Sequence, residues 1–236
     1  MPLFRVNDRI HYYAHVPKAG GSSVDHYLVA RFGPLAFFNG QFTAVPENQR
    51  WTRTSPQHIR WRNLYQLFPR DWIESSFAVV RDPLARLKSA YHFQKEALKS
   101  IPEDRTFEDW FKLRLAGIKQ NAFFDDNHLV PQTHIVPPDA RVFRLEDGLD
   151  GVVDYLDAIE GAPNGPRTVK THNARAKGST GKRRDPADGL SPEFLALIEE
   201  TYAEDYTRFG YPLRSSGADG SGAATSAPLP TEESVQ

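Results

Sequence analysis

Residues 15–24 read HVPKAGGSSV and place a lysine, two glycines and two serines in one short segment. Glycines let the backbone approach an anion closely, and successive N–H groups at a helix start bind phosphate or sulfate oxygens. Ser22 and Ser23 add hydroxyl donors and are expected to cap the helix, and the lysine supplies a positive charge. A plain strand-to-helix turn is the alternative, but the Pro-Lys pair before the glycines favours an anion site. The candidate anion-binding residues are Lys18, Ala19, Gly20, Gly21, Ser22 and Ser23.

The order of these residues differs from that of a Walker A loop. In a Walker A loop the lysine follows the glycines and precedes a serine or threonine. Here Lys18 precedes Gly20 and Gly21, so it would reach a ligand from the other side of the loop.

Residues 77–93, FAVVRDPLARLKSAYHF, form a second candidate anion site. An apolar strand would end at Arg81, Asp82-Pro83 would turn the chain, and a helix would carry Ser89. Ligands of parallel sheets bind beyond the carboxyl ends of the strands, and an arginine fork beside a hydroxyl suits a phosphate monoester. An Arg–Asp surface pair is the plainer alternative. We expect Arg86 to be structural.

Alternating strands and helices are needed to position both motifs. The spacing of apolar residues and the helix-capping residues predict strands at 10–16, 76–80 and 140–145. They predict helices at 22–32, 57–68, 83–99, 106–116 and 191–209. This order predicts an α/β fold, a three-layer P-loop-like domain whose mainly parallel central sheet is flanked by helices.

The domain organisation follows from composition along the chain. We expect a single domain over residues 1–213 and a disordered tail over 214–236, where almost nothing apolar could be buried. The polar stretch 161–190 is interpreted as a long loop inside the domain.

Composition excludes several classes of protein. The 236 residues contain no cysteine, which excludes a disulfide scaffold, a Cys-based zinc site, an iron–sulfur cluster and a Cys nucleophile. The net charge of −1 argues against a generally basic nucleic-acid binder. We see no signal peptide and no apolar run near the ~18 residues of a membrane span, so a cytoplasmic protein without stable membrane insertion is expected.

Positive charge is nevertheless concentrated in two segments. Residues 167–184 carry seven Lys/Arg and residues 48–70 carry five Arg, and neither segment contains an acid. We expect a locally positive cleft that steers an anionic donor and also suits an anionic acceptor. Solvated surface charge is the alternative for any single arginine.

Taken together, the two motifs resemble the sulfotransferase superfamily, specifically its family-2 carbohydrate-type branch, which includes heparan- and chondroitin-sulfate sulfotransferases and bacterial relatives. HVPKAGGSSV is similar to the family's 5′-phosphosulfate loop and VVRDPLARLKSAY to its 3′-phosphate site, with Arg81 and Ser89 eight positions apart. YAEDYTRFGY (202–211) resembles the family's closing helix. The resemblance extends from Ile10 to about Tyr211.

The resemblance implies 3′-phosphoadenosine 5′-phosphosulfate (PAPS) as co-substrate and a hydroxyl-bearing acceptor, of carbohydrate type and in some cases anionic, with no metal. It implies that the HVPKAGGSSV loop holds the 5′-phosphosulfate and that Arg81 and Ser89 hold the 3′-phosphate. Lys18 would stabilise the leaving phosphate oxygen. A late loop over the nucleotide is implied for Asn173, Lys177, Gly178 and Ser179.

The acceptor hydroxyl needs a general base, and a histidine with a pKa near neutrality suits that role. Of the eight histidines we select His58, which follows a Ser-Pro pair at an expected helix start. The resemblance implies a catalytic histidine in this region, whereas a capping or surface histidine is the alternative. His15 is expected to pack, and Glu146 is not expected to be the base.

Two other functions remain compatible with an anion-binding loop. One is a P-loop-type nucleotide kinase or hydrolase, against which the Lys-before-Gly order argues. The other is a non-catalytic module that binds an anionic nucleotide or glycan. The sequence contains no pattern that identifies the acceptor or the oligomeric state.

Overall fold

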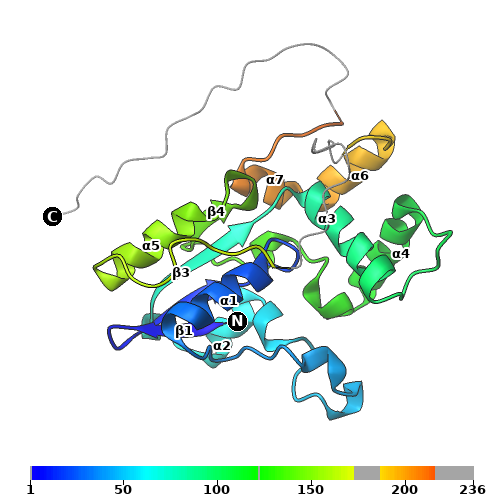
Figure 1. Ribbon diagram of the computed structural model, residues 1–236. Coiled ribbons are helices and arrows are strands. Elements are labelled where there is room, and N and C mark those ends of the chain that lie inside the picture. Colours follow the sequence, from blue (N-terminus) through cyan, green and yellow to red (C-terminus); the bar gives the residue numbers. More distant parts are fainter. Residues whose placement is uncertain (1, 122, 173–186, 216–236) are drawn as a thin grey trace.

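A four-stranded sheet forms the centre of the computed structural model, which describes residues 2–121, 123–172 and 187–215 (Figure 1). The sheet order is β1-β2-β3-β4, with β1 antiparallel to β2 and the other pairs parallel. The carboxyl ends of the last three strands therefore lie at one edge of the sheet. The strands are β1 (Leu3–Val6), β2 (Arg9–Ala14), β3 (Ile73–Val80) and β4 (Arg141–Arg144).

The two inner strands bury side chains on both faces of the sheet. Tyr13 and Phe77 belong to one hydrophobic cluster, and Tyr12 and Ala78 belong to the other. Successive side chains of a strand point to opposite faces, so a strand covered on both sides reads as a continuous apolar run. This is why the apolar run at the end of β3 was recognisable in the sequence.

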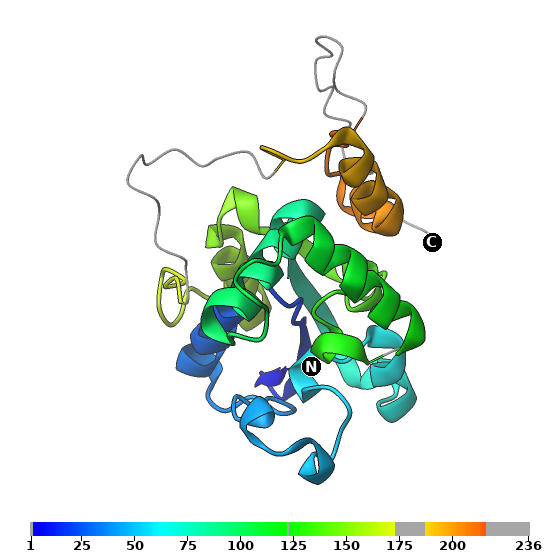
Figure 2. The ribbon, with the colours of Figure 1, turned by 90° about the vertical axis from the view of Figure 1, so that its right-hand side faces the viewer.

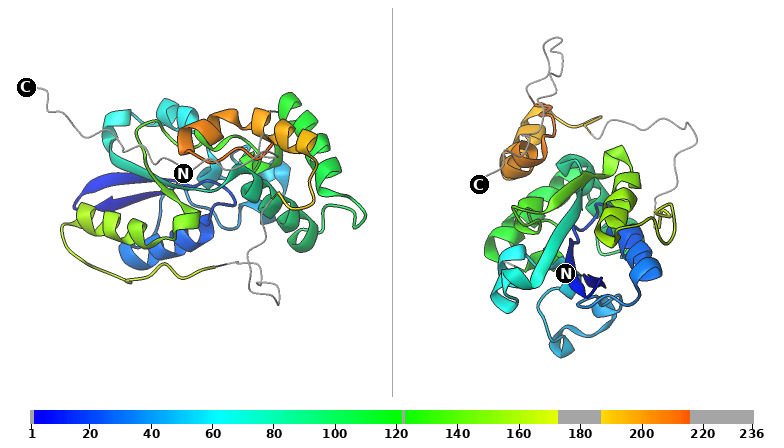
Figure 3. Two further views of the ribbon diagram at one scale, coloured as in Figure 1. Left: turned by 90° about the horizontal axis from the view of Figure 1, so that it is seen from above. Right: turned by 90° about the vertical axis from the view of Figure 1, so that its left-hand side faces the viewer.

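Helices cover each face of the sheet (Figure 2 and the right panel of Figure 3). α1 (Gly21–Phe32) and α5 (Asp150–Glu160) pack on the face that carries Tyr13 and Phe77. The opposite face is covered by α2 (Trp61–Leu67), α3 (Pro83–His92), α4 (Phe107–Gln120), α6 (Pro192–Thr201) and α7 (Ala203–Phe209). The expected three-layer α/β architecture with a mainly parallel sheet is confirmed.

Two elements, β1 and α5, were not expected from the sequence. β1 joins β2 through Asn7 and Asp8, whose φ angles of 48° and 64° are typical of a tight hairpin turn. α5 has buried Val152, Val153 and Leu156 at helical spacing and ends at Gly161, whose φ is 85°. Both signals were present in the sequence.

Three of the expected helices are shorter than expected or interrupted. In the segment 57–68 a 3₁₀ turn, Pro56–His58, precedes α2, because Ile59 and Arg60 are extended. α3 ends at His92 and a π turn follows over Phe93–Ala97. The single helix expected over 191–209 is interrupted at Tyr202, where φ is −116°.

Arg31 fixes α5 beside α1. Its buried guanidinium is 2.7 Å from both Asp157 and Glu160 at the end of α5. α1 and α5 are thereby held together by apolar packing against the sheet and by the ion pairs of Arg31.

The contacts of the domain extend slightly beyond the expected boundary. Arg214, the first residue of the expected tail, lies 2.8 Å from Asp82 at the start of α3, and Ser215 bonds to Glu199. Residues 216–236 lie outside the described residues. Within the described part of the chain, none of the helices combines the length and the apolar character that crossing a membrane requires.

Leu156→Ala tests whether α5 is an integral part of the fold. Leu156 is fully buried, so we expect the free energy of unfolding to fall by about 2–5 kcal/mol in urea denaturation. Leu113→Ala is the matched control, because Leu113 is 59% exposed on α4 and its truncation should change stability by less than about 0.5 kcal/mol. Equal effects of the two substitutions would contradict the packing of α5 against the sheet.

Candidate active site

The loop between β2 and α1 is shaped by left-handed backbone conformations. The φ angles of Lys18 and Gly20 are 67° and 84°. Glycine adopts this region readily, whereas at Lys18 the conformation is strained and must be held by its surroundings. Gly20 is the N-cap of α1 and no side chain caps this helix.

The serines do not have the capping role expected for them. The expectation that Ser22 and Ser23 cap the helix is wrong, because α1 already begins at Gly21 and both serines lie within its first turn. The buried Ser23 hydroxyl instead accepts the N–H of His172 at 2.9 Å. The N-terminal N–H groups of α1 are therefore left uncapped by side chains at the end of the loop, which is the arrangement that anion binding uses.

Gly21 is required by the ring of His15. A Cβ atom at Gly21 would lie 2.0 Å from His15 Nε2. The other ring nitrogen, Nδ1, is 2.9 Å from Asp25 Oδ2, and both residues are buried. His15 packs as expected, and it does so between α1 and the loop.

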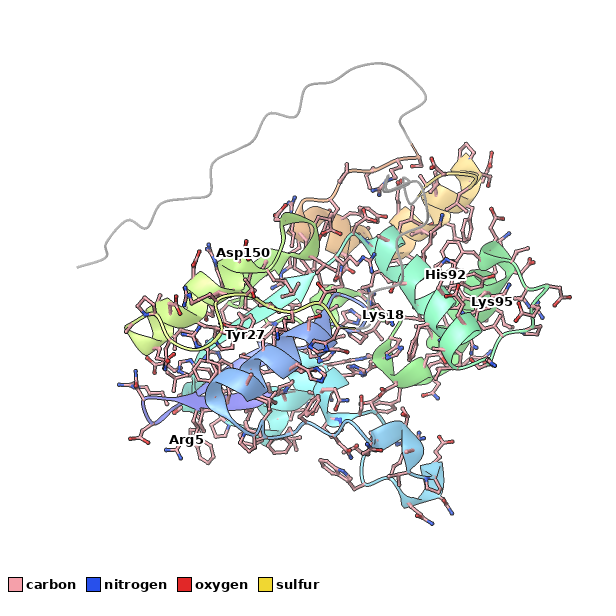
Figure 4. The ribbon with its side chains drawn as sticks, viewed as in Figure 1. Arg5, Lys18, Tyr27, His92, Lys95 and Asp150 are labelled. Atoms are coloured by element: carbon pink, nitrogen blue, oxygen red, sulfur yellow. The ribbon has the colours of Figure 1, made fainter. Side chains whose placement is uncertain are left out.

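Arg81 joins the second motif to the first. Its Nη1 donates to the Lys18 carbonyl at 3.2 Å, and its backbone N–H and C=O pair with the side chain of Gln132. The Lys18 ammonium lies 3.9 Å from the centre of the Phe93 ring, between α1 and α3 (Figure 4). Burial, and then the charge of Arg81, lower the pKa of Lys18 to about 8. Two cationic side chains thus converge where β2 and β3 end.

Ser89 and Arg86 of the second motif do not take part in the contact between Arg81 and Lys18. Ser89 lies further along α3 and is half-buried. Arg86 is fully buried and donates to the carbonyls of His128 and Val130, which is the structural role expected for it. Glu146 accepts from the Asp82 N–H and from the Tyr211 hydroxyl, which gives it a structural role at this edge of the sheet.

His58 is buried on its 3₁₀ turn and belongs to a row of three histidines. Its ring lies edge-to-face with those of His15 and His128, with centroids 5.0 Å away in each case. Because His15 also packs against Gly21, His58 is one ring away from the loop. Burial lowers the pKa of His58, and Asp126 opposes that effect.

The residues that hold His58 were not expected from the sequence. His58 Nδ1 is 2.8 Å from Asp126 Oδ2 and 2.8 Å from Ser55 Oγ. The ligand atoms of His58, Asp126 and His128 lie within 4.8 Å of one another, a spacing that would admit a metal ion. Hydrogen bonds already engage the Asp126 carboxylate and His58 Nδ1, so we interpret the group as a hydrogen-bonded cluster. Asp126 is 68 positions from His58, and no spacing in the sequence connects them.

The late-loop candidates Asn173, Lys177, Gly178 and Ser179 lie outside the described residues. The described segment before them reaches α1 at His172, through the bond to Ser23. The ring of His172 also stacks on that of His26, with centroids 4.2 Å apart.

The model of the sulfotransferase family matches residues 4–212. This chain belongs to the sulfotransferase family. A crystal structure of a sulfotransferase from Alicyclobacillus acidocaldarius is similar over 86% of this chain and 94% of that chain, with a TM-score of 0.47 and 15% sequence identity. No curated protein matches the chain. The protein is therefore an enzyme of sulfuryl transfer, and the match covers both the loop and Arg81.

Gly21→Ala tests the packing of this sulfotransferase loop. The added methyl group must displace the His15 ring, so we expect a loss of about 1–3 kcal/mol in the free energy of unfolding, measured by denaturant titration. Gly151→Ala is the control in the first turn of α5, where the nearest side-chain atom is 3.4 Å from the added Cβ and helix propensity favours alanine. A Gly21→Ala variant as stable as Gly151→Ala would contradict the close approach of His15.

Proposed function

We propose that this sulfotransferase takes PAPS as donor and transfers its sulfuryl group to an acceptor hydroxyl by in-line displacement. The hydrogen bond from Arg81 to the Lys18 carbonyl is the observation that carries the proposal. It joins the two motifs that resemble the 5′- and 3′-phosphate sites at the edge where parallel α/β sheets bind ligands.

The residues present fit such a donor. α1 has no side-chain cap, and its N-terminal N–H groups follow Gly20, whose left-handed backbone forms the end of the loop. Lys18 and Arg81 add positive charge beside the start of α1. We propose that the loop Lys18–Ser23 holds the 5′-phosphosulfate and that Arg81, with Ser89, holds the 3′-phosphate. The late loop, Asn173 to Ser179, is proposed to cover the nucleotide.

We propose that Lys18 stabilises the leaving phosphate. When the S–O bond to that phosphate breaks, negative charge grows on the bridging oxygen, and an ammonium group already in place lowers the energy of that charge. The Phe93 ring beneath the ammonium limits its positions without neutralising it. With a pKa of about 8, Lys18 is protonated at neutral pH.

His58 is proposed as the general base. Its burial lowers its pKa, so the neutral imidazole prevails at neutral pH, as proton acceptance requires. The His15 ring packs against both Gly21 and His58, so the His58 imidazole lies one ring away from the loop that is proposed to hold the sulfuryl group.

We propose that the acceptor is a carbohydrate, bound in a pocket whose lining residues precede the His58 turn and the Asp126 turn in the chain. A cavity of about 480 Å³ is lined by residues shortly before Ser55 and by Asn121 and Phe123, shortly before Asp126. Trp51 is 66% exposed there, and an exposed indole suits the apolar face of a sugar ring. The Arg53 guanidinium lies 5.2 Å from the Phe123 ring, where it could meet an anionic substituent. The described residues lining the cavity are Glu47, Arg50, Trp51, Thr52, Arg53, Asn121 and Phe123.

A ligand panel tests the donor. We expect adenosine 3′,5′-bisphosphate, the desulfonated product, to raise the thermal midpoint, and ATP with Mg²⁺ not to do so. Lys18→Met should weaken bisphosphate binding about 10- to 100-fold in calorimetry, because a charge-assisted contact is lost. Lys119→Met, on the exposed end of α4, should bind normally. Stabilisation by ATP with Mg²⁺ instead would indicate a nucleotide kinase or hydrolase, and bisphosphate binding without sulfuryl transfer would indicate a binding module.

The pH dependence of that binding has a definite sign. The anion binds the protonated form of Lys18, so affinity should fall as the pH rises through about 8, where Lys18 loses its proton. Lys18→Arg keeps its charge and should remove this decline. If the affinity of Lys18→Arg still falls with pH as in the wild type, another titrating group causes the decline.

Charge reversal tests the acceptor pocket. Arg53 and Arg62 both belong to the acid-free segment 48–70 that contains His58. Of the two, only Arg53 lines the cavity, whereas Arg62 lies over Trp61 on α2. For an anionic carbohydrate acceptor, Arg53→Glu should raise the acceptor KM about tenfold or more with the donor KM unchanged. Arg62→Glu is the control and should leave both values unchanged. Equal effects, or a change in stability alone, would refute the assignment of this pocket.

A further inference from the structure

The turn at Asp125, Asp126 and Asn127 is strained. The φ angles of these three consecutive residues are 50°, 53° and 60°, all in the left-handed region. This conformation costs roughly 1–2 kcal/mol for most residues with a Cβ. Asp and Asn tolerate it better as single residues, but three in succession persist only where the surrounding contacts maintain them. Strain of this kind is often found where function requires a fixed geometry.

The side chains of the turn show what the strained backbone positions. Asp126 bonds to His58 and Ser55, and the Asn127 amide donates to the His58 carbonyl at 2.9 Å. Asp125 points elsewhere, toward Gln94 and Arg114. Two adjacent residues of the turn therefore hold the side chain and the backbone of His58.

The hydrogen bonds determine the tautomer of His58. The Ser55 hydroxyl donates to Asp126 Oδ2 at 2.7 Å, so its proton is already used. The carboxylate can only accept, and both groups lie 2.8 Å from His58 Nδ1. Nδ1 must therefore carry the proton, and the lone pair of the neutral ring is on Nε2.

We infer that Asp126 is a positioning residue, which the strained turn holds against His58 so that Nε2 is the proton acceptor. The inference rests on the proposed role of His58. As the acceptor oxygen bonds to sulfur, its O–H bond breaks and the proton moves to Nε2, while the S–O bond to the phosphate breaks and its electron pair stays with the phosphate. Asp126 stabilises the imidazolium that results.

The charges around His58 are consistent with this role. Burial raises the pKa of the Asp126 carboxyl, but the hydrogen bond and charge of His58, together with His128 and Ser55, hold it below its usual range, so Asp126 is ionised. Burial and His58 lower the pKa of His128 to about 3, which leaves that ring neutral. His15 lowers the pKa of His58, and Lys18 acts in the same sense on His128. Asp126 is the group of this set that raises the pKa of His58.

The kinetic test is Asp126→Asn, an isosteric change that also suits a left-handed backbone. We expect kcat to fall about a hundredfold or more, with the donor KM and bisphosphate binding unchanged. The acid limb of kcat/KM should move to lower pH, because the carboxylate that raises the pKa of His58 is gone.

Asp125→Asn is the matched control, since it makes the same change in the same turn but removes a carboxylate that faces Arg114. Its kcat should stay within about threefold of the wild type. If Asp125→Asn loses as much activity as Asp126→Asn, or if the acid limb of Asp126→Asn does not move, Asp126 has only a structural role. Activity that is lost with EDTA and restored by Zn²⁺ would show a metal site instead.

A second measurement does not depend on sulfuryl transfer. The ring nitrogen NMR shifts of His58 should show the Nδ1–H tautomer in the wild-type protein and in Asp125→Asn, and a different tautomer mixture in Asp126→Asn. Unchanged shifts in Asp126→Asn would overturn the inference. If the wild-type protein shows the Nδ1–H tautomer but transfers no sulfuryl group, the proposed function fails while the positioning of His58 by Asp126 stands.

Discussion

The parallel pairing of β2 with β3 is the constraint on which the site depends. Ala14 and Ala78 are opposite each other in the register, so the chain leaves both strands at the same edge of the sheet. Lys18 follows one strand and Arg81 the other, which allows the Arg81 guanidinium to reach the Lys18 carbonyl. A one-residue slip would exchange the buried faces of β3, so the hydrophobic clusters on both sides also hold the site in register.

Four residues of the candidate site have strained backbone conformations. Lys18 has a left-handed backbone, as do the three residues of the turn that contains Asp126. Buried contacts compensate for these conformations: Lys18 is held by Arg81 through its carbonyl, and Asp126 and Asn127 are held by the His58 turn. The sulfotransferase thus uses part of its folding energy to keep a cation and an imidazole in place before any substrate binds.

The low overall charge of the protein conceals a locally cationic site. The net charge of −1 is the sum of two basic segments without acids, residues 48–70 and 167–184, and an acidic remainder of the chain. Lys18 and Arg81 are close enough that the arginine contributes to the lowered pKa of the lysine. Mutual repulsion of this kind is relieved when an anion binds between the cations, which links the electrostatics of the free protein to the proposed donor.

Local signals determined much of this fold. The apolar run of β3, Pro83 after Asp82 and the Ser191 cap before Pro192 are short-range patterns, and the structure contains a strand or a helix at each. The hairpin residues Asn7 and Asp8 and the apolar spacing of α5 were equally local, so β1 and α5 could also have been predicted. The order of elements was enough for the α/β class, because parallel strands with helical connections have few alternatives.

For the site, sequence patterns identified Lys18, Gly20, Gly21, Arg81 and His58 as candidates, because anion loops and bases have recognisable residue types. Tertiary structure alone decided that Ser23 binds His172 rather than capping α1, and that His15 makes Gly21 obligatory. It also decided that Asp126 faces His58. The contacts of Ser23 with His172 and of Asp126 with His58 join residues far apart in the chain. All three contacts depend on side-chain direction and backbone conformation, which periodicity and composition do not encode.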